Sequence, residues 1–291
     1  MTKNISHYYK NIILVSCLLF MLNSKTVMAQ TYSFISFNIK YDNTSDTVNN
    51  WNDRKQKMAQ FIAYYNPAFL GIQEGLARQV NYLNDALENY TFIGVGRDDG
   101  ATKGEYSAIF YDKMKFKALQ SSTFWLSESP EKVSVGWDAS MERVCTYGLF
   151  EDLNTNERIW VFNAHFDHIG PIARKESAAL IITKIREVNA AQLPVVLMGD
   201  FNAEPDDEPI QLFDDYLDDA LAISTNPLYG PTGTFNGFSD KVIVRRIDYF
   251  FTKGMKIWSY AHLDDKLNNN KHLSDHLPVL IKTEIIANVE N

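Results

Sequence analysis

The stretch that decides the fold is Pro194-Val-Val-Leu-Met-Gly-Asp-Phe-Asn-Ala-Glu-Pro205. Residues 195–198 form a continuous apolar run between a proline and a glycine, which is typical of a strand buried on both faces. Asp200 and Asn202 follow directly where this strand ends. A carboxylate at the end of a buried strand is costly unless it is paired, protonated or bound to a metal ion. The stretch therefore predicts a sheet that carries a polar site at one edge.

The same arrangement, an apolar strand with a polar side chain at or near its end, recurs along the chain. It occurs at Asn38, Glu74, His165, Asp248, Asp275 and His276. Each of these residues alone says little, because a strand-end Asn or Asp commonly forms a turn and a single His is commonly structural. As a set they indicate strand ends that converge on one edge of the fold, which is where α/β proteins place their ligand sites.

The order of the elements predicts the fold class. Helical spacing of apolar residues predicts helices over residues 53–65, 78–87 and 171–188. Apolar runs and alternating patterns predict strands over residues 32–38, 68–72, 91–95, 106–111, 116–125, 144–152, 158–165, 194–198, 246–252, 255–262 and 277–285. Each half begins as strand–helix–strand and continues into hairpins. We therefore expect one α/β domain, a four-layer α/β sandwich in which two mixed, mostly antiparallel sheets pack face to face with helices outside.

Composition and charge exclude several classes of protein. Of the 291 residues, 45% are apolar and 22% are charged, which excludes a collagen, a coiled coil and a largely disordered chain. The formal net charge is −8, whereas a protein that holds nucleic acid by bulk charge needs an excess of Lys and Arg. We therefore expect no tight binding of duplex DNA. A small or single-stranded phosphate ester stays compatible with this charge, because a metal ion can hold its phosphate.

Residues 1–29 are predicted to be a secretory signal peptide. Two lysines precede an apolar run at residues 12–22, and Val27-Met-Ala29 offers small residues before a cleavage point. The run is shorter than the roughly 20 residues that span a bilayer, which disfavours a membrane anchor. Leu14-Val-Ser-Cys17 looks like a lipoprotein cleavage box, but cleavage there would leave an apolar N-terminus, so lipidation is the less favoured alternative.

Export would leave residues 30–291 as the folded domain, in the periplasm or the medium, with no transmembrane segment. Removal of residues 1–29 takes away three lysines and no acid, so the formal charge would change from −8 to −11. Cys145 would then be the single cysteine, and we expect its thiol to be a small buried apolar group rather than a nucleophile. We also expect a monomer.

The donor atoms of the polar set indicate which metal ion would suit it. Its hard oxygen ligands are Asn38, Glu74, Asp200 and Asp275, and the sequence has no Cys/His cluster with zinc spacing. Such a set favours Mg²⁺ or Mn²⁺ over zinc. A divalent cation offsets the charge of a phosphate ester, and a carboxylate or imidazole can take a proton from water. The sequence carries neither a serine-hydrolase elbow nor a glycine-rich phosphate loop.

Six short motifs occur in an order that matches a known family. They are Ser36-Phe-Asn-Ile39, Ile72-Gln-Glu74, Asn163-Ala-His165, Gly199-Asp-Phe-Asn-Ala-Glu-Pro205, Arg246-Ile-Asp-Tyr249 and Ser274-Asp-His-Leu-Pro278. The series resembles the endonuclease/exonuclease/phosphatase superfamily, with its DNase I-like fold, over about residues 31–287. The resemblance implies a catalytic domain that is a metal-dependent phosphodiesterase or phosphatase. The superfamily spans nucleases, sphingomyelinases, inositol-phosphate phosphatases and deadenylases, and these motifs do not separate them.

The resemblance also implies a role for each matching residue. Glu74 would be the main metal ligand, with Asn38 and Asp275 beside it. Asp200 and Asn202 would position or activate the attacking water and hold a phosphate oxygen.

Two histidines and an arginine complete the implied site. His276, oriented by Asp248, would form a histidine–aspartate pair, and His165 would lie close to the phosphate or the leaving group. Arg143 looks like a phosphate-facing arginine, although its match is looser, and the alternative is an exposed salt-bridge partner.

Several residues beside the motifs bear on the substrate. We group His168 with the substrate contacts. Asp167 could also contact the substrate, but we favour a role in capping the helix that begins near Pro171 or in forming the turn before it. The segment Gly104-Glu-Tyr-Ser-Ala108 could bring Glu105 or Tyr106 to the rim of the site. The aromatic residues in the loop 233–238 could stack on a base or a sugar, although packing of the loop is the default.

Two hypotheses of different classes follow. The first is an exported, Mg²⁺- or Mn²⁺-dependent hydrolase that acts on a small or single-stranded phosphate ester by attack of an activated water. The alternative is a non-catalytic, secreted module on the same fold that binds a glycan or a protein partner. The sequence favours the enzyme, because every motif position holds a chemically competent residue.

Overall fold

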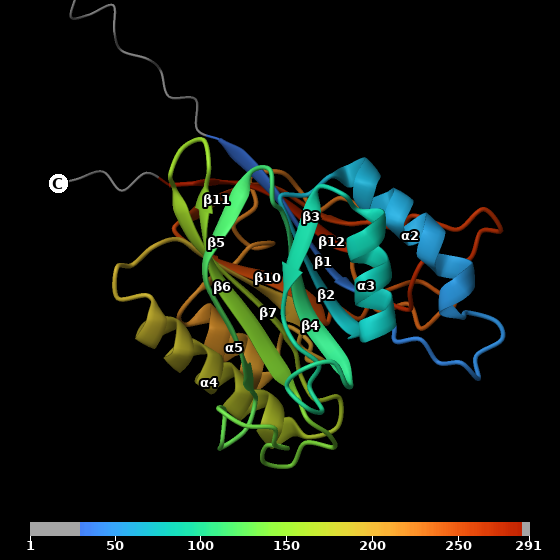
Figure 1. Ribbon diagram of the computed structural model, residues 1–291, viewed down its shortest axis with the longest axis horizontal. Coiled ribbons are helices and arrows are strands. Elements are labelled where there is room, and N and C mark those ends of the chain that lie inside the picture. Colours follow the sequence, from blue (N-terminus) through green and yellow to red (C-terminus); the bar gives the residue numbers. More distant parts are fainter. Residues whose placement is uncertain (1–29, 287–291) are drawn as a thin grey trace, which may run out of the picture. The chain divides into compact units, whose positions relative to one another are not determined.

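The computed structural model describes residues 30–286, and the folded unit begins at Thr31. It contains two six-stranded sheets that pack face to face, with helices on their outer faces (Figure 1). The predicted fold class is therefore confirmed. The predicted signal peptide at residues 1–29 lies outside the described residues. Within the described part, no helix combines the length and the apolar character needed to cross a membrane.

The first sheet has the strand order β11-β12-β1-β2-β4-β3. Its strands are β1 (Thr31–Asn38), β2 (Phe69–Leu76), β3 (Tyr90–Ile93), β4 (Glu105–Asp112), β11 (Met255–His262) and β12 (Val279–Ile285). All neighbouring strands are antiparallel except β1 and β2, which are parallel. The helix α2 (Trp51–Tyr65) connects this parallel pair, as a parallel connection requires a crossover.

The second sheet repeats this plan with the order β5-β6-β7-β8-β10-β9. Its strands are β5 (Phe116–Trp125), β6 (Val144–Asp152), β7 (Arg158–His165), β8 (Val195–Asp200), β9 (Asp218–Asp219) and β10 (Asp248–Lys253). Its single parallel pair is β7 with β8, and α4 (Pro171–Val188) makes the crossover. The carboxyl ends of both parallel pairs carry polar residues that the sequence singled out.

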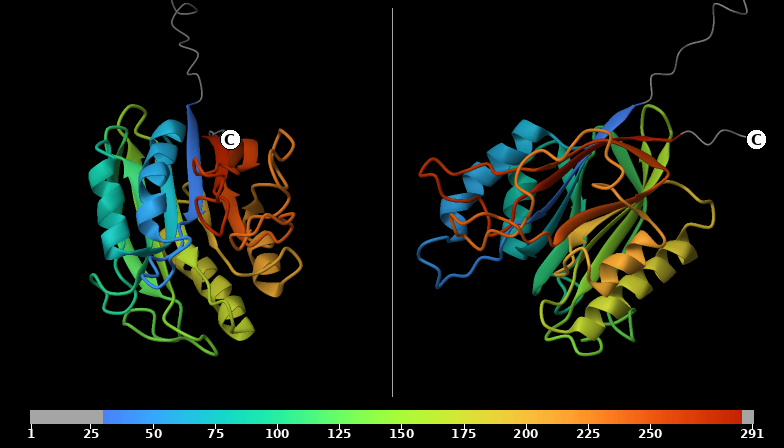
Figure 2. Two further views of the ribbon diagram at one scale, coloured as in Figure 1. Left: turned by 90° about the vertical axis from the view of Figure 1, so that its right-hand side faces the viewer. Right: turned by 180° about the vertical axis from the view of Figure 1, so that it is seen from behind.

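The helices cover the outer faces of the sheets. α2 and α3 (Ala77–Ala86) share an apolar core with β1, β2 and β4, whereas α4 and α5 (Glu208–Asp214) share one with β6, β7, β8 and β10. A third core lies between the sheets and is rich in phenylalanine. Figure 2 shows the blue-to-cyan helices and the yellow helix on different sides of the sheets.

Local sequence explains where the helices begin and end. The side chain of Asn50 accepts a hydrogen bond from the backbone N of Asp53 at the start of α2, and Asn66 ends this helix in the left-handed conformation with φ of 44°. α4 begins with Pro171 at its first position, where a missing N–H is tolerated. The predicted helices and strands agree with these elements within a few residues. The prediction missed α5 and β9, which are too short to give a clear period.

A polar contact between the sheets sets their relative position near the site. Asn163 on β7 donates from Nδ2 to the backbone oxygens of Ile72 (2.9 Å) and Ala108 (2.8 Å) on the other sheet. Gly71 leaves room beside it, since a Cβ atom there would lie 2.6 Å from Cε of Met198. The strands are thus held in close contact below the edge where they end.

Candidate active site

A cavity of about 410 Å³ opens at the edge where β1, β2, β7 and β8 end. It is lined by Lys40, Tyr41, Glu74, Glu105, Met141, Arg143, His165, His168, Asp200, Asn202, Phe235, Asp275 and His276. Asn38 and Asp248 are fully buried directly behind it and contact lining residues. The structure therefore brings all of the predicted site residues together, including Glu74 and His276, which the sequence separates widely.

Sheet register explains how three of these side chains meet. In the backbone pairing, Asp200 at the end of β8 lies opposite His165 of β7 on one side and opposite Asp248 of β10 on the other. The three residues consequently occupy neighbouring positions across adjacent strands. Phe201 follows Asp200 and is fully buried, so it anchors the turn that carries Asn202.

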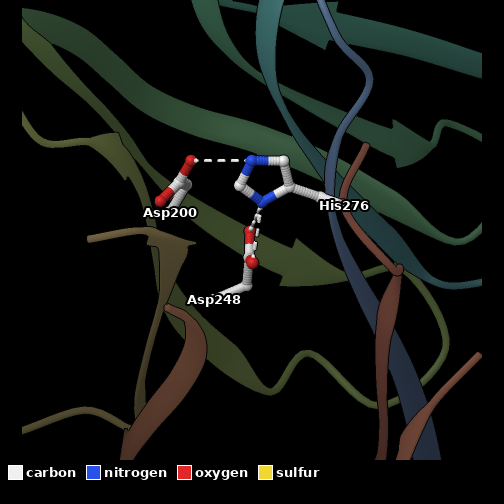
Figure 3. A group of neighbouring side chains, drawn as sticks. All are labelled: Asp200, Asp248 and His276. Carbon is white, nitrogen blue, oxygen red and sulfur yellow. Dashed lines mark hydrogen bonds and ion pairs between the residues drawn. The ribbon is translucent and has the colours of Figure 1, made fainter. Parts of the chain in front are cut away.

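His276 is held between two carboxylates (Figure 3). Its Nδ1 lies 2.9 Å from Oδ2 of Asp248, and its Nε2 lies 3.6 Å from Oδ2 of Asp200. Thr234 donates a hydrogen bond of 2.6 Å to Asp248 and fixes this carboxylate in turn. Burial alone would lower the pKa of His276, but the charges of Asp248 and Asp200 outweigh it and raise the pKa to about 10. The two carboxylates therefore favour the protonated, cationic form of His276.

Asp200 is the second titratable group in this arrangement. Burial and the nearby charge of Asp248 together raise its pKa to about 7, against the opposing effect of the His276 charge. Its Oδ1 accepts a hydrogen bond from the backbone N of Asn202, and its Oδ2 accepts one from Asn38. The hydrogen bonds thus fix the orientation of the carboxyl group. Its raised pKa allows it to take up and release a proton near neutral pH.

Asn38 links Asp200 to the predicted metal ligands. Its Nδ2 lies 2.9 Å from Oδ2 of Asp200 and 3.0 Å from Oε1 of Glu74. Glu74 lies at an irregularity in the pairing of β2 with β4 and has a φ of 62°, in the left-handed region that a glutamate rarely adopts. Backbone strain of this kind costs on the order of 1 kcal/mol and is found at functional positions.

Lys40 lies between the two remaining carboxylates. Its Nζ is 3.5 Å from Oε2 of Glu74 and 3.3 Å from Oδ2 of Asp275. Burial opposes ionisation of Glu74, yet Lys40 and His276 outweigh it and lower its pKa. Oxygens of Glu74 and Asp275 therefore converge on a single cationic atom, which means that they are placed to share a cation. The oxygen-rich donor set fits Mg²⁺ or Mn²⁺.

A second group of ligand atoms overlaps the histidine–aspartate pair. Single ligand atoms of Asp200, Asp248 and His276 all lie within 4.8 Å of one another and could hold a metal ion. This trio differs from the predicted ligands Asn38, Glu74 and Asp275. Nδ1 of His276 already contacts Asp248, and Asp248 accepts a hydrogen bond from Thr234. These ligand atoms therefore already have partners within the protein.

The opposite wall of the cavity is basic. Arg143 places Nη1 3.1 Å from Nδ1 of His165 and Nη2 3.0 Å from Nδ1 of His168. Arg143 is only 4% exposed, so the alternative of an exposed salt-bridge partner is wrong. Burial, followed by the charges of Arg143 and Arg97, holds the pKa of His165 well below its usual value, so this imidazole is neutral. Nδ2 of Asn202 also lies 3.2 Å from Nε2 of His165.

Asp167 supports Arg143 and does not cap α4. Its Oδ1 accepts from the backbone N of Ile169 and Gly170, which forms the predicted turn, and its Oδ2 lies 3.5 Å from Nε of Arg143. The backbone N groups of the first turn of α4 instead donate to Asp138. The helix-capping alternative is therefore corrected, because a loop distant in sequence provides the acceptor.

Some lining residues were not predicted. Lys40 and Tyr41 lie two and three residues after Asn38, and this nearness to a motif residue was the one signal available for them. Met141 belongs to an irregular segment. Phe235 belongs to the aromatic loop 233–238 that was considered for stacking on the substrate, and its ring centroid lies 5.0 Å from that of His276. Of the two candidates for the rim, Glu105 lines the cavity, whereas Tyr106 is buried and is not part of the lining.

The sandwich and its cavity define the class of DNase I-like α/β proteins. The chain belongs to the endonuclease/exonuclease/phosphatase family, whose model matches residues 35–276. Members of this family hydrolyse phosphoesters, which supports phosphoester hydrolysis as the reaction class of this site.

Three similar proteins illustrate the match. A family protein of Bacteroides thetaiotaomicron has 35% identity and a TM-score of 0.85, with 89% of this chain and 99% of that chain covered. A mannosyl-6-phosphatase of the same species has 35% identity and a TM-score of 0.83, with 87% and 99% covered. An uncharacterised protein of Acanthamoeba polyphaga mimivirus is 25% identical over 258 residues, which cover 81% of this chain and 92% of that protein.

Proposed function

We propose that the protein is a divalent-metal-dependent hydrolase of small phosphate esters that acts by direct attack of water. The observation that carries this proposal is the position of His276 between Asp248 and Asp200, with Glu74 reached through Asn38. A phosphate ester needs positive groups for its oxygens and a base for the water, and the cavity offers both within a few ångströms.

In this proposal the buried residues have separate tasks. Asp200 takes a proton from the attacking water, for which its pKa of about 7 is well suited. Cationic His276 stabilises the charge on the phosphoryl oxygens, and Asp248 keeps it oriented and protonated. On the other wall, Arg143 and neutral His165 hold the remaining phosphate oxygens, and Asn202 donates from its side chain amide.

The reaction balances without a covalent intermediate on the protein. A bond forms between the water oxygen and phosphorus, and the bond between phosphorus and the ester oxygen breaks. The alcohol leaves with a proton from solvent, and Asp200 returns the proton that it took to solvent. Glu74, Asp275 and Asn38 are the residues that would hold Mg²⁺ or Mn²⁺. When bound, such an ion supplies charge stabilisation to the phosphoryl group.

The size of the cavity and one relative support a small substrate. A volume of about 410 Å³ matches a small molecule better than a duplex, and the chain carries a net charge of −8. The similar Bacteroides protein is named as a mannosyl-6-phosphatase, so a hexose 6-phosphate is the first substrate to test.

The test is a panel of phosphate esters with Mg²⁺, with Mn²⁺ and with EDTA. The panel contains hexose 6-phosphates, p-nitrophenyl phosphate, bis-p-nitrophenyl phosphate and single-stranded DNA. We expect hydrolysis of a small ester that EDTA abolishes and that His276→Ala and Asp200→Ala both reduce, whereas Asp215→Asn at an exposed position has no effect. No turnover of any ester would overturn the proposal. Glycan binding that survives both site substitutions would instead support a non-catalytic module.

We also propose export through residues 1–29. Expression of the full chain in a bacterial host, followed by N-terminal sequencing of the exported protein, tests it. A new N-terminus at residue 30 is expected, and an intact chain retained in the cytoplasm would contradict export.

A further inference from the structure

One carboxylate in the cavity has no task in the proposed reaction. Glu105, the first residue of β4, lines the same cavity as the phosphate-binding groups, and its side chain is 17% exposed. A negative group in this place repels the substrate's phosphate. Glu105 must therefore either have a purely structural role or contact a part of the substrate other than the phosphate.

Arg97 fixes Glu105 from the side. Its Nη1 donates to Oε2 over 2.6 Å and its Nη2 donates to Oε1 over 3.1 Å, which is a two-pronged contact. Arg97 is held in turn, because its Nη2 contacts Sδ of Met141 and its backbone oxygen accepts from Nε1 of Trp125. Glu105 thus keeps one orientation with little freedom to swing away.

The ring of His165 lies close to both Glu105 and the proposed reaction centre. Nε2 of His165 lies 3.5 Å from Oδ2 of Asp200, and Nδ1 of the same ring lies 3.9 Å from Oε2 of Glu105. The two carboxylates therefore lie near different nitrogens of the His165 ring. A group bonded to the phosphate that passes this ring would reach Glu105.

The chemistry of a fixed carboxylate selects the group that it contacts. Each carboxylate oxygen can accept about two hydrogen bonds. Arg97 supplies one at each oxygen, so both oxygens keep the capacity to accept another from the cavity side. An ionised carboxylate only accepts, so its partner in the substrate must be a donor, and a neutral hydroxyl is the donor that carbohydrates provide. The apolar side chains of Met141 and Phe235 in the same lining suit the C–H faces of a sugar ring.

We propose that Glu105, held by Arg97, binds hydroxyl groups of the substrate's alcohol portion and so selects sugar phosphates over phosphate esters without hydroxyls. This proposal rests on the proposed function of the site, because it concerns the alcohol portion of the phosphate ester that the site would hydrolyse.

The test compares two substrates in one variant. Wild type and Glu105→Gln are assayed with a hexose 6-phosphate and with n-butyl phosphate, which has a similar alkyl leaving group but no hydroxyls. A hydrogen bond to a charged group contributes about 1.5–3 kcal/mol, which corresponds to a factor of roughly 10–150. We expect the ratio of kcat/KM for the sugar phosphate to that for butyl phosphate to fall by about this factor, mainly through a higher KM for the sugar phosphate.

Two other outcomes overturn the inference. If Glu105 serves only to hold Arg97, or protonates the leaving group, both substrates lose activity together and the ratio stays constant. If it contacts nothing in the substrate, neither value changes. Glu131→Gln, a matched change at an exposed position, controls for nonspecific effects. Failure of the proposed function is distinguishable, because wild type would then hydrolyse neither ester.

Discussion

Gln73 donates a hydrogen bond of 2.7 Å from Nε2 to Oδ1 of Asn163, across the interface between the two sheets. Both residues are fully buried, and the amide of Asn163 also contacts the backbone of β2 and β4. Glu74 follows Gln73 directly and His165 lies two residues after Asn163. The contact therefore joins the half of the site carried by one sheet to the half carried by the other.

Substitution of Asn163 should affect stability and activity together. Asn163→Ala removes one acceptor from the side chain amide of Gln73 and one donor from each of two backbone oxygens, and such a loss costs about 2–4 kcal/mol of unfolding free energy. Urea unfolding measures this change, and a phosphatase assay at low temperature measures the activity of the folded fraction. Asn154→Ala in an exposed turn serves as the control and should change stability by less than about 0.5 kcal/mol. A stability loss as small as that of the control would contradict the role of this contact.

Asp248→Asn should reduce turnover without unfolding the protein. The amide has a similar size but cannot stabilise the imidazolium, so the pKa of His276 should fall from about 10. We expect kcat to decrease by a factor on the order of 10²–10⁴. Steady-state kinetics measure the rate, and NMR of the imidazole protons follows the titration. An unchanged titration of His276 would show that Asp248 does not set its charge.

Arg143→Lys should show that the planar guanidinium is needed. A lysine keeps the charge but cannot contact His165, His168 and Asp167 at once, so kcat/KM should fall by a factor of roughly 10–100. Arg158→Lys supplies the matched control, because Arg158 forms an exposed ion pair with Glu151. Equal kinetics for the two variants would remove Arg143 from phosphate binding.

Metal binding is expected to stabilise the protein through Glu74. At a metal concentration of about 100 times Kd, a site present only in the folded state adds about 2.7 kcal/mol to the unfolding free energy. Thermal unfolding with Mn²⁺ or Mg²⁺ should show this increase for wild type, and EDTA should reverse it. Glu74→Gln should lose the increase, whereas Glu187→Gln on the surface of α4 should retain it. An increase that survives Glu74→Gln would place the ion elsewhere.

The stability of the protein should fall in acid because of His262, which lies outside the cavity. Burial lowers its pKa to about 4, and the charge of Arg246 contributes in the same direction, against the hydrogen bond to the backbone oxygen of Pro231. Below pH 6.5, the ordinary pKa of histidine, His262 takes up a proton in the unfolded chain but stays neutral in the folded protein. The stability that His262 contributes is therefore fully present above pH 6.5 and is lost as the pH falls toward 4.

The effect of His262 can be isolated with a variant that does not titrate. The difference in unfolding free energy between wild type and His262→Gln should shrink by about 2 kcal/mol between about pH 7.5 and about pH 5. Urea unfolding at both pH values measures it. A constant difference would mean that folding does not lower the pKa of His262.

The sequence predicted those parts of the site that depend on strand ends. An apolar run such as residues 195–198 has one way to be buried, so the position of Asp200 followed from the pattern. The order of the motifs then supplied Asn38, Glu74 and His276.

The other parts depend on contacts that no local pattern reports. The burial of Arg143 depends on Asp167 and on two histidines from a different segment. The orientation of Glu105 depends on Arg97, which lies eight residues earlier in an irregular loop, where no periodic pattern indicates which side chains meet. α5 has only seven residues, and helices this short leave too few turns for an apolar stripe to be recognised.

The left-handed backbone of Glu74 places stability and activity in conflict, because glycine would suit the backbone and glutamate is needed for the site. Lys40 and Asn202, which line the same cavity, have positive φ values as well, at 55° and 47°. Glycine at these places would relax the main chain and lose the functional group. A selection for thermal stability alone should therefore enrich glycine at these positions, and the selected variants would be more stable but inactive.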